Sequence, residues 1–225
     1  MKIPVSMTVL TLVSPKSAMK ISLFLIIASV GSLLTSTATA QSTSSFTSAE
    51  RSQLRRGRLV TRNETEMRDG LRLIGGTAFQ VINAPPEVVW RAVMDIERWN
   101  RFVPQVVESR TVSSASGRKT IYLRHEHGPV EAAYHLRLTH MDSQRMAQFR
   151  LDRTRRNDLR EGWGFFIVAP FGNGKTMITF GVMADVGSGI ITGLVRPTVH
   201  EWMLRIPQQL KSWVEGAGRR RYARD

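Results

Sequence analysis

Apolar residues recur along the chain at two spacings, one typical of β-strands and the other of α-helices. Between 130 and 139 apolar and polar residues alternate, so Ala132, Tyr134 and Leu136 share one face of a predicted strand and His135 lies on the other. Shorter alternating or extended stretches predict further strands at 58–61, 71–83, 106–113, 119–127, 147–151, 163–167 and 176–185.

Helical spacing marks three other segments. A capping-box pattern that begins at Thr47 predicts a short helix over 48–56. A second helix is predicted over 86–97, where a proline suits the first turn. The third, over 199–214, repeats apolar residues at i, i+3, i+4 and i+7, and Pro207 should kink it.

The order of these elements indicates an α+β fold with helices on one face of an antiparallel sheet. We expect a strongly twisted sheet to wrap around the long C-terminal helix and to enclose an apolar cavity. The chain then divides into a leader at 1–40, an N-terminal extension with a short helix at 41–70, the main domain at 71–216 and a basic tail at 217–225.

The leader has the layout of a secretory signal peptide. It contains no acidic residue, Lys20 precedes an apolar stretch over 21–34, and Ala38 and Ala40 form a small-x-small cleavage site. We expect cleavage after Ala40 and export to the periplasm or the medium, with Met19 as the true start. The alternative is a retained membrane anchor, although the apolar run is shorter than the roughly 20 residues of a spanning helix.

The chain is basic and lacks cysteine. Its 32 Lys and Arg residues against 18 Asp and Glu residues give a net charge of +14, and loss of the leader leaves 29 against 18, or +11. This charge predicts peripheral contact with an anionic membrane or envelope surface, whereas export argues against nucleic acid as a partner. The absence of cysteine excludes disulfides, cysteine nucleophiles and thiolate metal sites.

Two stretches and the C-terminal helix resemble the START-like superfamily, which is also called SRPBCC or helix-grip. The first stretch spans 82–109 and includes Trp90, and the second spans 162–182. Over about 75–216 the chain is similar to the polyketide cyclase and coenzyme-Q-binding START-domain type. The resemblance implies a deep apolar cavity between the sheet and the C-terminal helix that holds a lipid, a quinone, a polyketide or another hydrophobic small molecule. It transfers no catalytic residue, because the superfamily has no universal ones.

Aromatic side chains, methionine and two histidines are the candidate ligand-binding residues. Such side chains suit a large apolar cavity, although they also fill ordinary cores. The candidates are Trp99, Phe102, Leu123, His125, His127, Tyr134, Trp163, Phe165, Trp202, Met203 and Ile206.

His125 and His127 share one face of a predicted strand. They are interpreted as structural histidines near the cavity mouth or as hydrogen-bond partners of a ligand head group. A zinc site would need a third ligand that the sequence does not identify. We therefore expect no metal and no cofactor.

The remaining motifs give enzyme function no positive support. Residues 169–176 match a relaxed phosphate loop, but a strand follows where that motif needs a helix, so a hairpin turn is predicted. The leading hypothesis is an exported protein that binds a hydrophobic small molecule without catalysis. The alternatives are an enzyme of the cyclase or hydratase type that uses cavity His and Tyr residues, and a non-catalytic envelope interaction protein with a filled interior.

Export predicts a defined mature N-terminus. Protein recovered from the periplasm or the medium should begin at Gln41, because the cleavage site ends at Ala40. N-terminal sequencing measures this directly. Exported protein that retains Met19 would show that the apolar segment stays as a membrane anchor.

Overall fold

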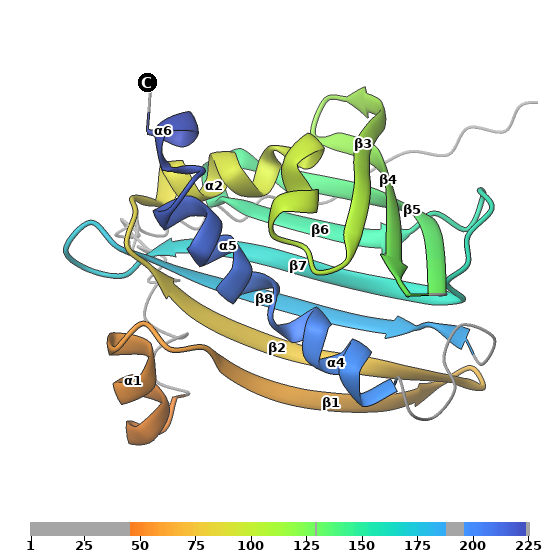
Figure 1. The fold of residues 1–225 in the computed structure, drawn as a ribbon, viewed down its shortest axis with the longest axis horizontal. Helices are drawn as coiled ribbons and strands as arrows, with labels where there is room; N and C mark the ends of the chain where they lie inside the picture. The colour runs from red at the N-terminus through yellow and green to blue at the C-terminus, as the bar shows by residue number, and fades with distance from the viewer. Residues whose placement is uncertain (1–45, 129, 188–195, 224–225) are drawn as a thin grey trace, which may run out of the picture. The chain divides into compact units, whose positions relative to one another are not determined.

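The computed structural model describes residues 46–128, 130–187 and 196–223 (Figure 1). The expected leader and its cleavage site lie outside these residues. The described part forms one antiparallel sheet with the strand order β1-β2-β8-β7-β6-β5-β4-β3, which confirms the predicted α+β class. The strands are β1 (Val60–Arg68), β2 (Leu71–Ile82), β3 (Val106–Ala115), β4 (Arg118–His127), β5 (Val130–Met141), β6 (Met146–Leu151), β7 (Glu161–Pro170) and β8 (Thr176–Asp185).

The described helices gather mainly on one face of this sheet. Figure 1 shows α2, α4 and α5 crossing the face that we call the inner face. Their bounds are α1 (Ser48–Arg55), α2 (Pro86–Met94), α4 (Arg196–Leu204), α5 (Ile206–Glu215) and α6 (Arg219–Tyr222), with 3-10 turns η1 (Ile96–Arg101) and η2 (Asp142–Gln144). None of the helices in the described part of the chain is long and apolar enough to cross a membrane.

The main core lies between the inner face and helices α2 and α5. Cross-strand partners Ala78, Phe180 and Phe166 place their side chains on this face in register, and all three are buried. Leu210 and Val214 of α5 pack into the same cluster. The apolar stripe of α5 and the alternation of the strands therefore meet in one core.

A second, smaller core lies on the opposite, outer face. Helix α1 begins at the predicted capping box, in which the Glu50 backbone N–H donates to Thr47 Oγ1 over 3.1 Å. Its Leu54 packs with Val60 and Val81 at the ends of β1 and β2. This packing fixes the N-terminal extension to the sheet.

The extension also contributes a full strand. β1 pairs with β2 from Val60↔Phe79 to Arg68↔Leu71, so the expected boundary after residue 70 falls inside a hairpin turn. The pattern predicts only 58–61 as extended, because the charged residues that follow hide the rest of the strand. Charged side chains are typical of an edge strand, where they discourage pairing with other chains.

The predicted kink in the C-terminal helix is a break. α4 ends at Leu204 and α5 starts at Ile206, with Arg205 between them. Pro207 lies in the first turn of α5, where its missing N–H costs no hydrogen bond. Inside a continuous helix the same proline would clash with the carbonyl of Met203.

The segment predicted as a basic tail, 217–225, contains helix α6 at residues 219–222, and this helix packs on α2. Tyr222 is only 4% exposed, and its hydroxyl donates to Asp95 Oδ2 over 3.0 Å. Arg221 Nε donates to the same oxygen over 2.8 Å, and Arg91 Nε donates to the Tyr222 carbonyl over 3.1 Å. Burial raises the pKa of the Tyr222 hydroxyl. The sequence does not reveal this contact, because the buried tyrosine follows a run of three arginines that is typical of an exposed segment.

We predict that α6 stabilises the fold. Tyr222→Ala should lower the free energy of unfolding by about 3 kcal/mol, because it removes a buried aromatic ring. Arg220→Ala, at an exposed position of the same helix, should change it by less than about 0.5 kcal/mol. Urea unfolding of both variants measures the difference, and equal midpoints would show that α6 does not support the core.

Candidate functional site

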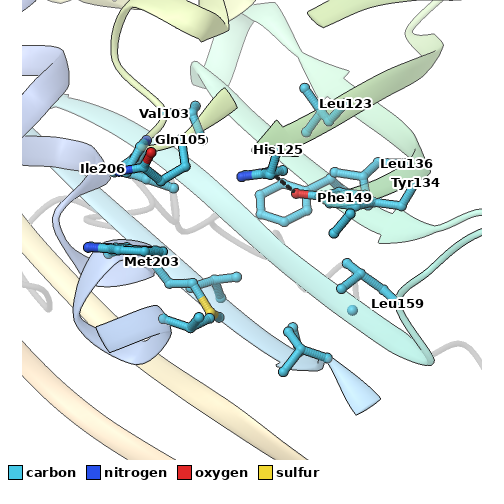
Figure 2. Close-up of a pocket in the computed structure, with 18 of the residues that line it drawn as sticks. Val103, Gln105, Leu123, His125, Tyr134, Leu136, Phe149, Leu159, Met203 and Ile206 are labelled. Carbon is cyan, nitrogen blue, oxygen red and sulfur yellow. Dashed lines mark hydrogen bonds between the residues drawn. The ribbon is translucent and has the colours of Figure 1, made fainter. Parts of the chain in front are cut away.

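A cavity of about 170 Å³ lies among β4, β5, β7 and β8 of the sheet, helices α4 and α5, and the segment around Pro104. Figure 2 shows side chains from these elements converging on it, with His125 and Tyr134 on one side and Met203 and Ile206 on the other. The cavity therefore lies between the sheet and the two halves of the broken C-terminal helix.

Nine of the eleven candidate residues line this cavity. They come from segments far apart in the sequence, and strand alternation or helical spacing brings most of them to one space. They are Trp99, Leu123, His125, His127, Tyr134, Trp163, Trp202, Met203 and Ile206. Trp163 is the exception to the alternation, because it shares the strand phase of Phe165 and borders the cavity near the start of β7, beside Met183.

The other two candidates lie elsewhere. Phe102 is 2% exposed and packs beside Trp99 in the core, with 6.3 Å between ring centroids, but it does not line the cavity. Phe165 lies on the outer face, where its ring covers the backbone of Gly181. Its neighbour Phe166 lines the cavity instead. Because strand side chains alternate, an error of one residue in the expected phase selects the wrong face.

Three phenylalanines that are not among the predicted site residues form much of the apolar wall. The Phe166 and Phe180 rings are 4.7 Å apart between centroids, and Phe149 lies 5.8 Å from Phe166. The Phe149 ring occupies the space that a side chain at position 164 would need, so glycine there is required. The sequence does carry a signal for two of them, because Phe149 and Phe180 are large apolar residues within predicted strands.

His125 and Tyr134 form the central polar pair of this wall. His125 Nε2 lies 2.8 Å from the Tyr134 hydroxyl oxygen, the contact dashed in Figure 2, and the rings stack at 17° with centroids 5.4 Å apart. Tyr134 is paired across the strands with Leu123, so it lies diagonally across from His125 on the same face. The hydrogen bond fixes both side chains in the cavity.

The surroundings keep both groups neutral at pH 7. Burial lowers the pKa of His125 to about 4, and a hydrogen bond to the Pro104 backbone opposes this shift only in part. Burial also raises the pKa of the Tyr134 hydroxyl. A neutral imidazole and a neutral phenol can take part in hydrogen bonds without placing a charge in the apolar cavity.

His127 closes one side of the cavity rather than joining this pair. Its ring meets Trp202 of α4 edge to face, with centroids 4.5 Å apart and an interplanar angle of 71°. The contact joins the end of β4 to the C-terminal helix. Among the described residues, no group of three or more His, Asp or Glu side chains is placed to hold a metal ion.

No arginine or lysine is among the described residues that line the cavity. Arg124 and Arg153, which could in principle hold an anionic head group, form ion pairs with Glu126 and Glu161. Residues 170–176 form the predicted hairpin turn between β7 and β8. The lining is therefore mainly apolar, and Glu126, the carboxylate that reaches it, is paired with Arg124.

Comparison with known proteins places the chain among others of this architecture. A family model described as polyketide cyclase / dehydrase and lipid transport matches residues 76–212. No curated protein sequence matches the chain. Several solved structures are similar to the chain at low sequence identity, among them the following three.

One is a protein from Thermus thermophilus, with 20% identity, a TM-score of 0.54 and coverage of 63% of this chain and 97% of that one. The second is a STAR-related lipid transfer protein from Xanthomonas axonopodis, with 15% identity, a TM-score of 0.54 and coverage of 69% and 98%. The third is a START superfamily protein from Mycobacterium smegmatis, with 15% identity, a TM-score of 0.52 and coverage of 62% and 95%. These likenesses confirm the helix-grip fold.

The low pKa of His125 predicts an acid-sensitive fold. Between about pH 6.5 and pH 4 the unfolded chain binds a proton at this site and the folded protein does not, so stability falls as the pH is lowered through this window. The loss should approach about 3 kcal/mol. His125→Gln removes the titrating group, so its unfolding free energy should depend less on pH. Parallel urea-unfolding curves against pH for the two proteins would contradict this account.

Proposed function

Because the chain belongs to the polyketide cyclase / dehydrase and lipid transport family, we propose that it binds a hydrophobic small molecule in the cavity between the sheet and helices α4 and α5, without catalysis. The observation that carries this proposal is the cavity itself, which has an apolar aromatic wall and neutral His125 and Tyr134 side chains. Apolar pockets with a few placed polar groups are typical of small-molecule sites.

The size of the cavity limits the ligand. About 170 Å³ is less than the roughly 300–1,000 Å³ of pockets that hold drug-sized molecules, and less than the several hundred Å³ expected of a large lipid site. It is close to the roughly 150 Å³ of an engineered apolar cavity that binds benzene. The enclosed part of the ligand is therefore a single ring or a short chain. Because side chains do not fill this cavity, it also argues against the alternative of a non-catalytic interaction protein with a filled interior.

The enzyme alternative would use the same His125 and Tyr134 pair. A general base works best when its pKa lies near the operating pH, and His125 has a pKa of about 4. Burial raises the pKa of the Tyr134 hydroxyl, which makes it a poorer acid. Both shifts favour binding over proton transfer at neutral pH.

Export and surface contact are part of the same proposal. Their support is the signal-peptide layout of residues 1–40 and the net charge of +11 that would remain after cleavage. Arg55, Arg58 and Arg220 are exposed and could meet anionic lipid head groups or envelope polymers. Arg221 has a structural role in α6, so removal of the whole tail would not isolate the surface contribution.

The matched variants Ala132→Phe and Ala133→Phe test the site. Ala132 lines the cavity, whereas Ala133 is the next residue of β5 and faces away from it. With ethylbenzene as the probe, calorimetry should show binding to the wild type and to Ala133→Phe, and affinity lower by about tenfold or more for Ala132→Phe, whose ring fills the site.

Native mass spectrometry and solvent extraction of the purified protein would identify a ligand that is retained from the cell. Melting temperatures of both variants control for misfolding. Absence of ethylbenzene binding to the wild type, or equal binding by two folded variants, would overturn the assignment of this cavity.

A further inference from the structure

We propose that Gln105, at the mouth of the cavity, binds the polar end of the ligand, so that the site takes an amphiphile with an apolar body and a neutral hydrogen-bonding group such as an amide or an alcohol. This inference rests on the proposed function and specifies the chemistry of its ligand. Two observations carry it. The Gln105 backbone adopts a conformation that suits glycine, and the Gln105 side-chain amide has no hydrogen-bond partner among the described residues.

The mouth of the cavity is marked by the lining residues that are exposed. These are Gln105, Glu126 and His127, whereas the other described lining residues are buried or half-buried. The Glu126 backbone N–H donates to the Gln105 carbonyl over 2.9 Å, which holds Gln105 beside the end of β4. Figure 2 shows Gln105 among the side chains around the cavity, on the same side as Ile206. The Gln105 side chain therefore lies between the enclosed space and solvent.

Gln105 occupies a turn position that glycine would fill without strain. In the turn at 103–106, the Val106 backbone N–H donates to the Val103 carbonyl over 3.3 Å, and Pro104 and Gln105 are the two central residues. Gln105 has a φ of 61°. A proline followed by a residue with positive φ is the arrangement of a type II turn, in which glycine or asparagine usually takes the third position. A residue with a Cβ costs free energy there, so the turn alone does not account for glutamine.

The other described non-glycine residues with positive φ have explanations away from the cavity. Asp69 and Asn173 lie in hairpin turns, and both residue types tolerate this conformation. Arg145 follows η2, and its side chain pairs with Glu87. None of these three positive-φ residues lines the cavity. Backbone strain gathers at ligand sites, and Gln105 is the described residue that combines such strain with a place in the lining.

The Gln105 amide is available to a ligand, whereas other polar side chains of the lining have partners. His125 and Tyr134 are hydrogen-bonded to each other, and the Glu126 carboxylate is paired with Arg124. An amide offers both donors and an acceptor, so it can bind a polar group of either kind.

Two further side chains of the lining are less suited to this contact. The His127 ring packs edge to face on Trp202. The Trp163 Nε1–H is buried without a partner, but this residue shares the strand phase of Phe165, whose ring lies on the outer face. Gln105 is therefore the residue that the geometry favours for the polar end of the ligand.

The charges near the mouth favour a neutral polar end. No arginine or lysine is among the described lining residues, so a carboxylate would find no cation there that could pair with it. It would instead approach the Glu126 carboxylate, whose backbone N–H is bonded to Gln105. A neutral group avoids this repulsion and remains partly hydrated at an exposed mouth.

Single-ring probes test the role of Gln105 by calorimetry at pH 7.5. Ethylbenzene has no polar group, and 4-ethylbenzamide adds a neutral amide to the same ring. The affinity for 4-ethylbenzamide relative to ethylbenzene should fall about fivefold in Gln105→Leu, a change that corresponds to about 1 kcal/mol, the net worth of a protein hydrogen bond. Gln148→Leu makes the same substitution at an exposed position on the outer face of β6 and should keep the wild-type ratio.

Gln105→Gly separates the side chain from the turn. It removes the amide, so the affinity ratio should again fall about fivefold. The melting temperature should stay the same or rise, because glycine adopts positive φ without strain. A lower melting temperature together with an unchanged ratio would show that Gln105 serves only the fold.

The charge restriction has its own probe. 4-Ethylbenzoate has the same ring with a negative charge, and the wild type should bind it at least about threefold more weakly than 4-ethylbenzamide. Equal binding of the two compounds would overturn the restriction to neutral groups.

The remaining outcomes separate this inference from the proposed function. An unchanged ratio in both Gln105 variants, with ethylbenzene bound by the wild type, would overturn the role of Gln105 and leave the proposed function standing. A ratio that falls in His127→Phe but not in the Gln105 variants would overturn it in favour of His127. Failure of the wild type to bind any of the three compounds would overturn both.

Discussion

The sheet can bury only one side chain in two along each strand on its inner face, and this period of two controls both the core and the cavity. Ala78, Phe180 and Phe166 lie side by side across three strands because the antiparallel register keeps paired residues on one face. The same rule on β4 and β5 brings His125 and Tyr134 together. A shift of one residue in either strand would turn the polar pair to the outer face and remove it from the cavity.

Because the C-terminal helix is broken, its two halves cover different parts of the inner face. α5 packs Leu210 and Val214 into the core. α4 contributes Trp202 and Met203 to the cavity wall, and its contact with His127 joins it to the end of β4. Pro207 permits this division, because it starts a new helix instead of continuing the old one.

The sequence predicts the fold well because the fold depends on local periodicity. The capping box at Thr47, the helix that starts at Pro86 and most strands are found where the pattern places them. The site is harder to predict, because it depends on the phase of that periodicity within each strand. The pattern favours Phe165 over Phe166 for this reason, since both are aromatic and only the register separates them. The docking of Tyr222 could not be predicted, because α6 meets α2 through contacts 127 residues apart.

The chain carries a large positive charge, but no arginine or lysine is among the described residues that line the cavity. Two buried carboxylates, Asp152 and Glu161, are paired with Arg137 and Arg153 away from the cavity lining. These pairs satisfy buried charges that would otherwise destabilise the fold. In the cavity wall, His125 and Tyr134 are hydrogen-bonded to each other and stay neutral at pH 7, and Glu126, which also lines the cavity, is paired with Arg124. The arginines of the chain therefore lie outside the described lining of the cavity, whose wall is mainly apolar.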